Sequence, residues 1–368
     1  MKQLIFVSTT IDRGGAELLM LQLARELRRE YQIRIIYLKG KGTLREDFRA
    51  LGVDPLKFGP STLPAILRLL WRERDLVLQG WMYHGNLLAC LLQGLALGRQ
   101  RLFWAVHHSA AAYAARSLMS RLRLKCTAWL SGLARGIAYV SEPVRAEHEG
   151  LGYARRKSVV IHNGIELRDF ARDREAGLRL RQQLGIGPED TVVGAVGRNH
   201  PDKDYPTLLS AVFLLLRRHP RLHFVAAGRG LKPENFASQL AELNPEERRR
   251  LHLLDERRDV LAILSALDVY TLSSLSESFS LSLIEALAAG LCCVSTDVVW
   301  FSGLFPQALK TVPTRDAPAL AVAVEEWLDL PGETRRQLGW QARETVGEVF
   351  SLDRTVSGYK ELWIASVK

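Results

Sequence analysis

Two glutamates, Glu277 and Glu285, stand eight residues apart where a short polar loop is predicted to become an apolar helix. A helix that begins near Ser280 directs its free backbone N–H groups outward, and such a helix end binds anions such as phosphate. Carboxylates that accept hydrogen bonds from sugar hydroxyls, beside amides that hold phosphate, indicate a nucleotide-sugar pocket. The structural alternative is that Glu277 is an acid favoured by the helix dipole and Glu285 belongs to a solvated face.

Two cations occupy a second loop, residues 196–204, which follows an apolar run predicted to be a buried strand. Arg198 ends that strand and Lys203 lies at the next helix start, so both side chains can reach one point. Two converging cations suit a diphosphate, because Arg offers a two-pronged donor and Lys a point charge. The structural alternative pairs Lys203 with a neighbouring aspartate, Asp202 or Asp204, on the surface.

Alternating strands and helices predict the scaffold that positions these loops. Apolar, β-branched runs alternate with helical stretches in both halves of the chain, which is typical of parallel sheets with crossover helices. We therefore predict an α/β protein with two doubly wound, Rossmann-like domains that face a central cleft. The clearest predicted strands are residues 4–8, 33–38, 76–81, 102–106, 136–140, 192–196, 222–227, 269–272 and 292–295.

A turn signal at residues 162–164, followed by a charged segment, marks the boundary between the two domains. We expect residues 1–165 to form an acceptor-binding domain, residues 166–349 a donor-binding domain, and residues 350–368 a helix that crosses back to the first domain. Ligands of open parallel sheets bind at the carboxyl ends of the strands. A turn with Gly15 follows the first strand, where the absence of a Cβ lets the backbone approach a phosphate or an acceptor.

Composition indicates a globular protein of two domains, with 368 residues, of which 47% are hydrophobic and 24% charged. The four cysteines lack the spacing of a metal site or a disulfide framework, which fits a reducing cytoplasm. The apolar start is too short for a signal peptide. Polar residues interrupt the longest apolar stretch, residues 76–98, so we expect no membrane span.

Positive charge is concentrated in the first half of the chain. Residues 1–165 hold 25 Lys and Arg against 12 Asp and Glu, whereas residues 166–368 hold 25 against 28. Residues 76–141 contain seven basic residues and no acid. A basic amphipathic helix is predicted there, and it suits anionic lipid headgroups or a phosphorylated acceptor, although a solvated basic helix is the alternative. The predicted acceptor or membrane face consists of Arg116, Arg121, Arg123 and Lys125.

Taken in order, several motifs resemble those of the retaining glycosyltransferases of family 4, which have the GT-B fold. The likeness covers nearly the whole chain, and it is specific for the fold and the donor class rather than for the sugar. The matching segments are residues 14–17, 81–84, 140–142, 161–165, 196–198, 203–204, 206–211, 277–290 and 350–352.

The resemblance implies a role for each matching residue. Arg198 and Lys203 would neutralise the donor diphosphate and stabilise the leaving nucleoside diphosphate. Glu285 would hold the ribose hydroxyls, and Glu277 would contact hydroxyls of the donor sugar. His108 follows a strand of the first domain, where the family often places a histidine near the reacting sugar.

Further donor-binding positions also follow from the resemblance. Gly15 would approach the diphosphate from the first domain. The other positions are the backbone amides of Phe279, Ser280 and Leu281, together with Arg258.

The family's reaction retains the anomeric configuration by a front-face displacement, in which the departing phosphate takes the acceptor proton. Such a reaction needs charge stabilisation and positioning more than a protein nucleophile. The resemblance implies no metal and no other cofactor, since Arg198, Lys203 and the helix start supply the positive charge. A covalent role for Glu277, by analogy with retaining glycosidases, stays open as an alternative.

This sequence departs from the family's pattern at three places. Ser278 and Ser280 replace glycines that commonly flank the phenylalanine of the glutamate motif, which adds a Cβ and a hydroxyl at each position. Asp255 stands where a glycine is usual near the base. Val299 and Trp300 replace an expected glycine pair. These departures leave the donor preference open.

We expect a cytoplasmic enzyme at the inner face of the membrane that transfers a hexose-type sugar from a nucleoside-diphosphate sugar to a lipid-linked or polysaccharide acceptor. Its product would be a surface polysaccharide such as O-antigen, capsule or exopolysaccharide. The alternatives are a nucleotide-sugar enzyme without transfer, such as a 2-epimerase, and an inactive membrane-binding scaffold. No nucleic-acid motif accompanies the basic charge, and no G-x-G-x-x-G follows either domain's first strand, which disfavours an NAD dehydrogenase.

Overall fold

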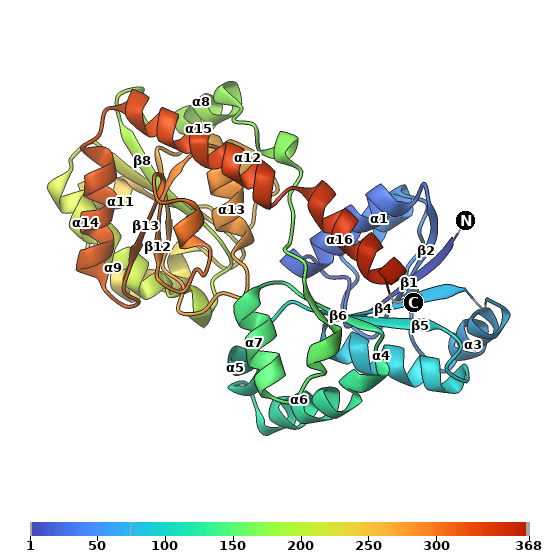
Figure 1. Ribbon diagram of the computed structural model, residues 1–368. Coiled ribbons are helices and arrows are strands. Elements are labelled where there is room, and N and C mark those ends of the chain that lie inside the picture. The colour runs from blue at the N-terminus through green and yellow to red at the C-terminus, as the bar shows by residue number, and fades with distance from the viewer. Residues whose placement is uncertain (1, 74, 366–368) are drawn as a thin grey trace. The chain divides into compact units, whose positions relative to one another are not determined.

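The computed structural model describes residues 2–73 and 75–365, which form two compact units. Unit 1 runs to Gly164 and also includes the segment that begins at Leu352, and unit 2 is Ile165–Ser351. Each unit is a parallel sheet with helices packed on it (Figure 1). The unit boundaries lie after residues 164 and 351, whereas the sequence placed them after residues 165 and 349.

Unit 1 contains a seven-stranded parallel sheet in the order β3-β2-β1-β4-β5-β6-β7. Its central strands are buried on both faces, which explains why they read as nearly continuous apolar runs rather than as alternating ones. The strands are β1 Lys2–Ser8, β2 Tyr31–Tyr37, β3 Leu56–Lys57, β4 Leu76–Trp81, β5 Arg101–Val106, β6 Gly136–Tyr139 and β7 Ser158–Val160.

The C-terminal helix α16, Leu352–Ala365, belongs to unit 1 and lies beside α1, Gly15–Leu27 (Figure 1). Its Trp363 is buried and donates a hydrogen bond to Gln79 of β4, so this late segment completes the core of the first unit. The remaining helices of unit 1 are α2 Arg45–Ala50, α3 Leu63–Arg72, α4 Met82–Leu95, α5 Ala110–Ala114, α6 Leu118–Leu130 and α7 Glu142–Gly150, with short 3₁₀ helices η1 Ser131–Leu133 and η2 Arg155–Lys157.

Unit 2 contains a six-stranded parallel sheet in the order β10-β9-β8-β11-β12-β13. The order of its strands along the sheet repeats that of the first six strands of unit 1, without repeating the sequence. The two doubly wound, parallel sheets that the sequence predicted are thereby confirmed. The strands are β8 Thr191–Val196, β9 Leu222–Ala227, β10 Leu251–Leu253, β11 Val269–Leu272, β12 Cys292–Thr296 and β13 Leu309–Val312.

Four helices of unit 2, α8, α9, α11 and α14, begin at a residue whose side chain caps the first turn. Asp204 caps α9, and Asp316 caps α14, each by accepting a backbone N–H of the first turn. The helices are α8 Arg174–Gln183, α9 Tyr205–Arg218, α10 Ala237–Leu240, α11 Pro245–Arg249, α12 Val260–Ala266, α13 Leu281–Ala288, α14 Ala317–Leu328 and α15 Gly332–Val349, with 3₁₀ helices η3 Leu167–Phe170, η4 Pro201–Lys203, η5 Pro233–Phe236 and η6 Ser302–Leu304.

Candidate active site

The loops after β8 and β11 meet at the point where the strand order of unit 2 reverses. These strands are neighbours, yet the chain leaves β8 for β9 on one side and leaves β11 for β12 on the other. Open α/β sheets bind ligands at such a switch point, outside the carboxyl ends of the strands. The two loops are joined, since Leu275 N donates to Asp202 O at 2.7 Å and Ser273 Oγ donates to Lys203 O at 2.7 Å.

Lys203 and Glu277 form an ion pair at this switch point. Lys203 Nζ lies 2.5 Å from Glu277 Oε1, and Ser274 Oγ donates to the same oxygen at 2.7 Å. The side chains are only 21% and 10% exposed, so the pair is shielded from solvent screening. The lysine stem passes over Gly197, where a Cβ would lie 3.8 Å from Lys203 Cε.

The alternative pairing of Lys203 with its aspartate neighbours is wrong. Asp204 adopts the left-handed conformation, with φ of 45°, and its carboxylate accepts Thr207 N at the start of α9. Asp202 lies 3.2 Å from His200 Nδ1. The two aspartates form an Asp-x-Asp triplet around Lys203, but their side chains serve these separate partners.

Glu285, the fifth residue of α13, is a partly buried carboxylate. No group in the part of the chain that the structure describes hydrogen-bonds its carboxylate. Burial raises the pKa of Glu285 to about 7, and the positive charge of Lys203 opposes that rise. A buried carboxyl group with a raised pKa and no hydrogen-bond donor from the protein is typical of functional sites, because a bound ligand can supply the missing donors.

Helix α13 begins at Leu281 with Ser280 as its N-cap, as the sequence predicted. The Ser280 hydroxyl does not cap the helix. It is buried and has no hydrogen-bond partner among the described residues. The Leu281 amide donates to Phe279 O at 3.0 Å. One of the three amides predicted to contact the nucleotide sugar is therefore already hydrogen-bonded within the turn.

An aromatic cluster fixes the approach to α13. The Phe279 ring centroid lies 5.4 Å from that of Phe350 and 6.0 Å from that of Phe301, and Trp300 packs against all three. Trp300 is one of the two residues that replace the expected glycine pair. Its packing role was not predicted, because Phe279 and Phe350 are far apart in the sequence and only the fold brings them together.

Arg198 is exposed at the end of β8 and makes no ion pair with any described residue. The structure therefore places Lys203, but not Arg198, in contact with the glutamate motif. Arg258 is likewise exposed before α12, where its neighbours Arg257 and Asp259 pair with each other at 2.5 Å.

Asp255 occupies its glycine-like position with a positive φ of 48°. Its carboxylate accepts Gly230 N at 2.7 Å and pairs with Lys232 at 3.2 Å, and its carbonyl accepts Gly228 N. Asp tolerates the left-handed conformation better than most residues, which explains how it replaces glycine here. Asp255 thus closes the loop that follows β9, a role that the sequence did not reveal.

The predicted residues of unit 1 lie at the carboxyl end of that unit's sheet. Gly15 is the exposed first residue of α1, and His108 is a half-buried residue after β5. Trp81, the last residue of β4, donates to Ala16 O at 3.1 Å, which joins the end of β4 to the start of α1 at the reversal between β1 and β4. His107 packs on Trp81, and burial lowers its pKa to about 3.

The predicted basic face requires a correction. Arg116 precedes α6 rather than belonging to it. Arg123 turns inward and donates to the Tyr113 hydroxyl, so it is half-buried. Only Arg121 and Lys125 project from α6 into solvent, because the helical turn separates them from Arg123.

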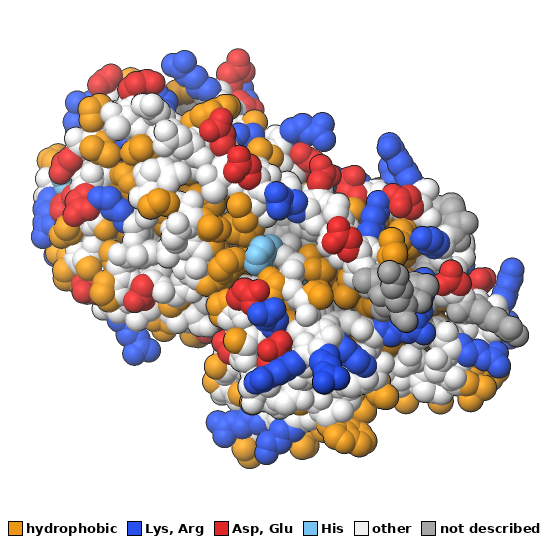
Figure 2. Space-filling model, viewed as in Figure 1, with side chains coloured by type: hydrophobic (Ala, Val, Ile, Leu, Met, Phe, Trp, Pro, Cys, Tyr) orange, Lys and Arg blue, Asp and Glu red, His pale blue; other side chains and the backbone are white. Residues whose placement is uncertain are grey.

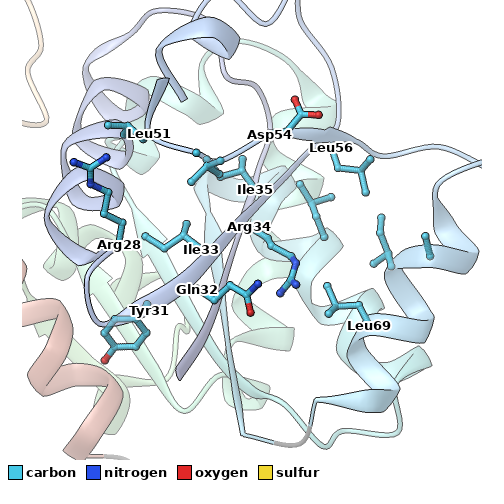
Figure 3. A pocket seen from close by; sticks show the side chains of 15 residues that line it. Arg28, Tyr31, Gln32, Ile33, Arg34, Ile35, Leu51, Asp54, Leu56 and Leu69 are labelled. Atoms are coloured by element: carbon cyan, nitrogen blue, oxygen red, sulfur yellow. The ribbon is translucent and has the colours of Figure 1, made fainter. Parts of the chain in front are cut away.

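A cavity of about 610 Å³ opens elsewhere in unit 1 (Figure 3). It lies along β2, between the end of α1, the segment before β3, and α3, and is lined mainly by apolar side chains such as Ile33 and Leu69. None of the predicted site residues lines it. Its lining takes in residues 31–36 of β2 but none of the loops that follow β1 and β4, where ligands of such sheets bind.

Within residues 2–73 and 75–365, no group of three or more His, Cys, Asp or Glu side chains is arranged to hold a metal ion. The four cysteines form no disulfide. None of the described helices has the length and apolar character needed to cross a bilayer.

Comparison with known families gives two matches, one for each unit. Residues 13–169 match the family described as Glycosyltransferase Family 4, and residues 178–345 match Glycosyl transferases group 1. Together the matches leave out only residues 1–12, 170–177 and 346–368.

Curated relatives match part of the chain. EpsF of Bacillus subtilis, which carries the name of a glycosyltransferase, is 27% identical over 216 residues, covering 54% of this chain and 53% of EpsF. The D-inositol 3-phosphate glycosyltransferase of Nocardia farcinica is 33% identical over 172 residues, covering 45% of this chain and 38% of that protein. The matches thus span about half or less of the length of these relatives.

Solved structures match nearly the whole chain. HepE of Anabaena, determined in complex with UDP-glucose, has a TM-score of 0.82 at 17% identity and covers 98% of this chain and 99% of its own. Sucrose-phosphate synthase from Thermosynechococcus elongatus has a TM-score of 0.78 at 17% identity, with 99% and 98% covered. At these identities the likeness concerns the fold, and it confirms the predicted GT-B class.

Proposed function

We propose that this chain, whose residues 13–169 match Glycosyltransferase Family 4 and whose residues 178–345 match Glycosyl transferases group 1, is a glycosyltransferase that transfers a hexose-type sugar from a nucleoside-diphosphate donor. The observation that carries this proposal is the shielded pair of Lys203 and Glu277 beside the partly buried Glu285, at the switch point of unit 2. This arrangement offers one cation for phosphate and two carboxylates for hydroxyls.

Lys203 is the proposed electrophilic group. Its ammonium would donate a hydrogen bond to a phosphate oxygen of the donor and stabilise the negative charge that develops on the leaving nucleoside diphosphate. Glu277, which now accepts from Lys203 and Ser274, would accept hydrogen bonds from hydroxyls of the donor sugar. Arg198 is exposed, and in this proposal it closes on the diphosphate from the end of β8.

Glu285 is the proposed ribose ligand. Its carboxylate lacks an internal hydrogen-bond donor among the described residues, so two ribose hydroxyls would supply the missing partners. The rest of the proposal is a retaining, front-face displacement that needs no metal, with Gly15 and His108 of unit 1 contributing to the diphosphate and the reacting sugar. Phe279, Ser280, Leu281 and Arg258 remain proposed donor contacts.

The proposed acceptor is a lipid-linked or polysaccharide glycan at the inner face of the cytoplasmic membrane, in the synthesis of a surface polysaccharide. The acid-free, basic stretch of residues 76–141 supports an anionic acceptor environment. The similarity to EpsF, a bacterial protein with the name of a glycosyltransferase, over 54% of this chain also supports this proposal.

A screen of nucleotide sugars for released nucleoside diphosphate, with bacterial membrane extract as the source of acceptor, tests this function. We expect turnover with at least one UDP-hexose or GDP-hexose. Release of nucleoside diphosphate together with the free 2-epimer of the sugar would instead identify an epimerase. No turnover, combined with no thermal shift on addition of UDP or GDP, would identify an inactive scaffold.

A further inference from the structure

Helix α6 turns its large apolar side chains into solvent. Leu118 is 78% exposed and Trp129 is 82% exposed, values that leave these side chains almost without packing. We refer to the exposed apolar residues of this region as the α6 stripe. It consists of Leu118, Met119, Leu122 and Trp129 of α6 and Leu133 of the following 3₁₀ helix.

The opposite, buried face of α6 carries two apolar side chains, Leu124 and Ala128, and two hydroxyl side chains, Ser120 and Thr127. The two hydroxyls are satisfied through Ser117 and Tyr153, while the apolar residues of the stripe point away. A surface helix of a globular protein ordinarily buries its apolar side and exposes its polar side. Most of the large apolar side chains of α6 lie on its exposed side instead, which indicates that a second apolar phase covers the stripe.

Basic residues flank the stripe along the chain, and acids do not. Arg121 and Lys125 are exposed on α6, Arg116 precedes it, and residues 76–141 contain no Asp or Glu. Figure 2 shows basic side chains beside apolar ones along the lower edge of this unit. The charge therefore selects an anionic surface, and the exposed tryptophan suits the boundary between headgroups and acyl chains.

Apolar exposure continues onto α4, which packs against α6. Leu91 and Leu95 of α4 and the following Leu97 are exposed, and Trp71 of α3 donates to Leu95 O at 3.1 Å. Isolated exposed leucines are common on soluble proteins, but a run of them across adjoining helices marks an interaction surface.

We propose that the α6 stripe inserts into the interfacial layer of an anionic lipid bilayer, with Arg116, Arg121 and Lys125 contacting the headgroups. This inference rests on the proposed membrane-linked acceptor and deepens it, because it assigns membrane contact to apolar insertion rather than to charge alone. The helix lies in the plane of the interface and does not cross it.

Vesicle flotation tests the inference with three variants of the full chain. The apolar variant carries Leu118→Ser, Met119→Ser, Leu122→Ser and Trp129→Ser. The charge variant carries Arg116→Gln, Arg121→Gln and Lys125→Gln. The control carries Leu178→Ser and Trp340→Ser, which remove exposed apolar side chains from unit 2 instead.

The parent and the control should float with vesicles of phosphatidylglycerol and phosphatidylcholine but not with phosphatidylcholine alone. The partition of the apolar variant onto anionic vesicles should fall by at least about tenfold, even at low salt, because the apolar area that would be buried in the bilayer is removed. The charge variant should lose binding as well, and the parent's binding should weaken with salt.

Equal flotation of the apolar variant and the parent would overturn the inference. Binding of the parent only to vesicles reconstituted with membrane proteins would also overturn the inference, since a protein partner would then cover the stripe. A thermal-shift titration with UDP and GDP separates this outcome from failure of the proposed function. The apolar variant should show the parent's shift, which also establishes that it folds.

Discussion

Lys203→Ala is expected to lower turnover by about 10²- to 10³-fold while leaving the protein folded, which is the usual loss when one charge-stabilising group is removed from a transition state. In this structure Lys203 is the cation that contacts Glu277, with Nζ 2.5 Å from Oε1, and exposed Arg198 makes no such contact. Steady-state release of nucleoside diphosphate measures the effect. A thermal melt shows whether the variant is folded.

The matched control is Lys310→Ala, which removes the lysine of another Lys–Glu pair in unit 2, on the edge strand β13. Its turnover should equal the parent's. Glu277→Ala should reduce transfer more than it reduces UDP binding, because its proposed partners are hydroxyls of the sugar. Unchanged turnover in Lys203→Ala would reject the diphosphate role of this lysine.

Glu285→Gln is expected to stabilise the protein at pH 8 and to weaken nucleotide binding by about tenfold or more. Burial raises the pKa of Glu285 to about 7 from an ordinary value of 4.5, so the native state holds this proton more tightly than the unfolded chain. The associated stability is complete below about pH 4.5 and is lost as the pH rises through about 7. A neutral glutamine avoids that loss, which amounts to at most about 3 kcal/mol.

Urea unfolding of the parent and of Glu285→Gln at pH 5 and pH 8 measures this effect. The stability difference should favour the variant at pH 8 and shrink at pH 5. Glu333→Gln, a substitution at an exposed helix position of unit 2, is the control and should show no such change. A variant less stable than the parent at pH 8 would show that the Glu285 carboxylate is structural.

The central strands of both sheets were predictable because each is an apolar, β-branched run buried on two faces. The strands that escaped prediction are short and lie at or near the sheet edges. They are the edge strands of the two sheets, β3 Leu56–Lys57, β7 Ser158–Val160, β10 Leu251–Leu253 and β13 Leu309–Val312. Such strands are half covered and carry polar residues, so their sequence signal is weak.

The positions of the candidate site residues were only partly predictable. The cap of α13 and the loop after β8 follow from local sequence, whereas the contact between Lys203 and Glu277 depends on two loops 74 residues apart. The side on which a cation projects also escaped prediction, as Arg123 shows by turning to Tyr113. Side-chain direction on a helix depends on its rotation against the core, which a charge pattern alone does not determine.

We propose that a nucleoside diphosphate binds at the joined loops after β8 and β11 in unit 2. Hydrogen exchange of the parent with and without saturating UDP or GDP tests it most directly, since bound phosphate and ribose would slow exchange of the surrounding amides. We expect protection in peptides covering residues 197–204 and 277–285, with no change in α6. Nucleotide binding without protection in those two segments would contradict it.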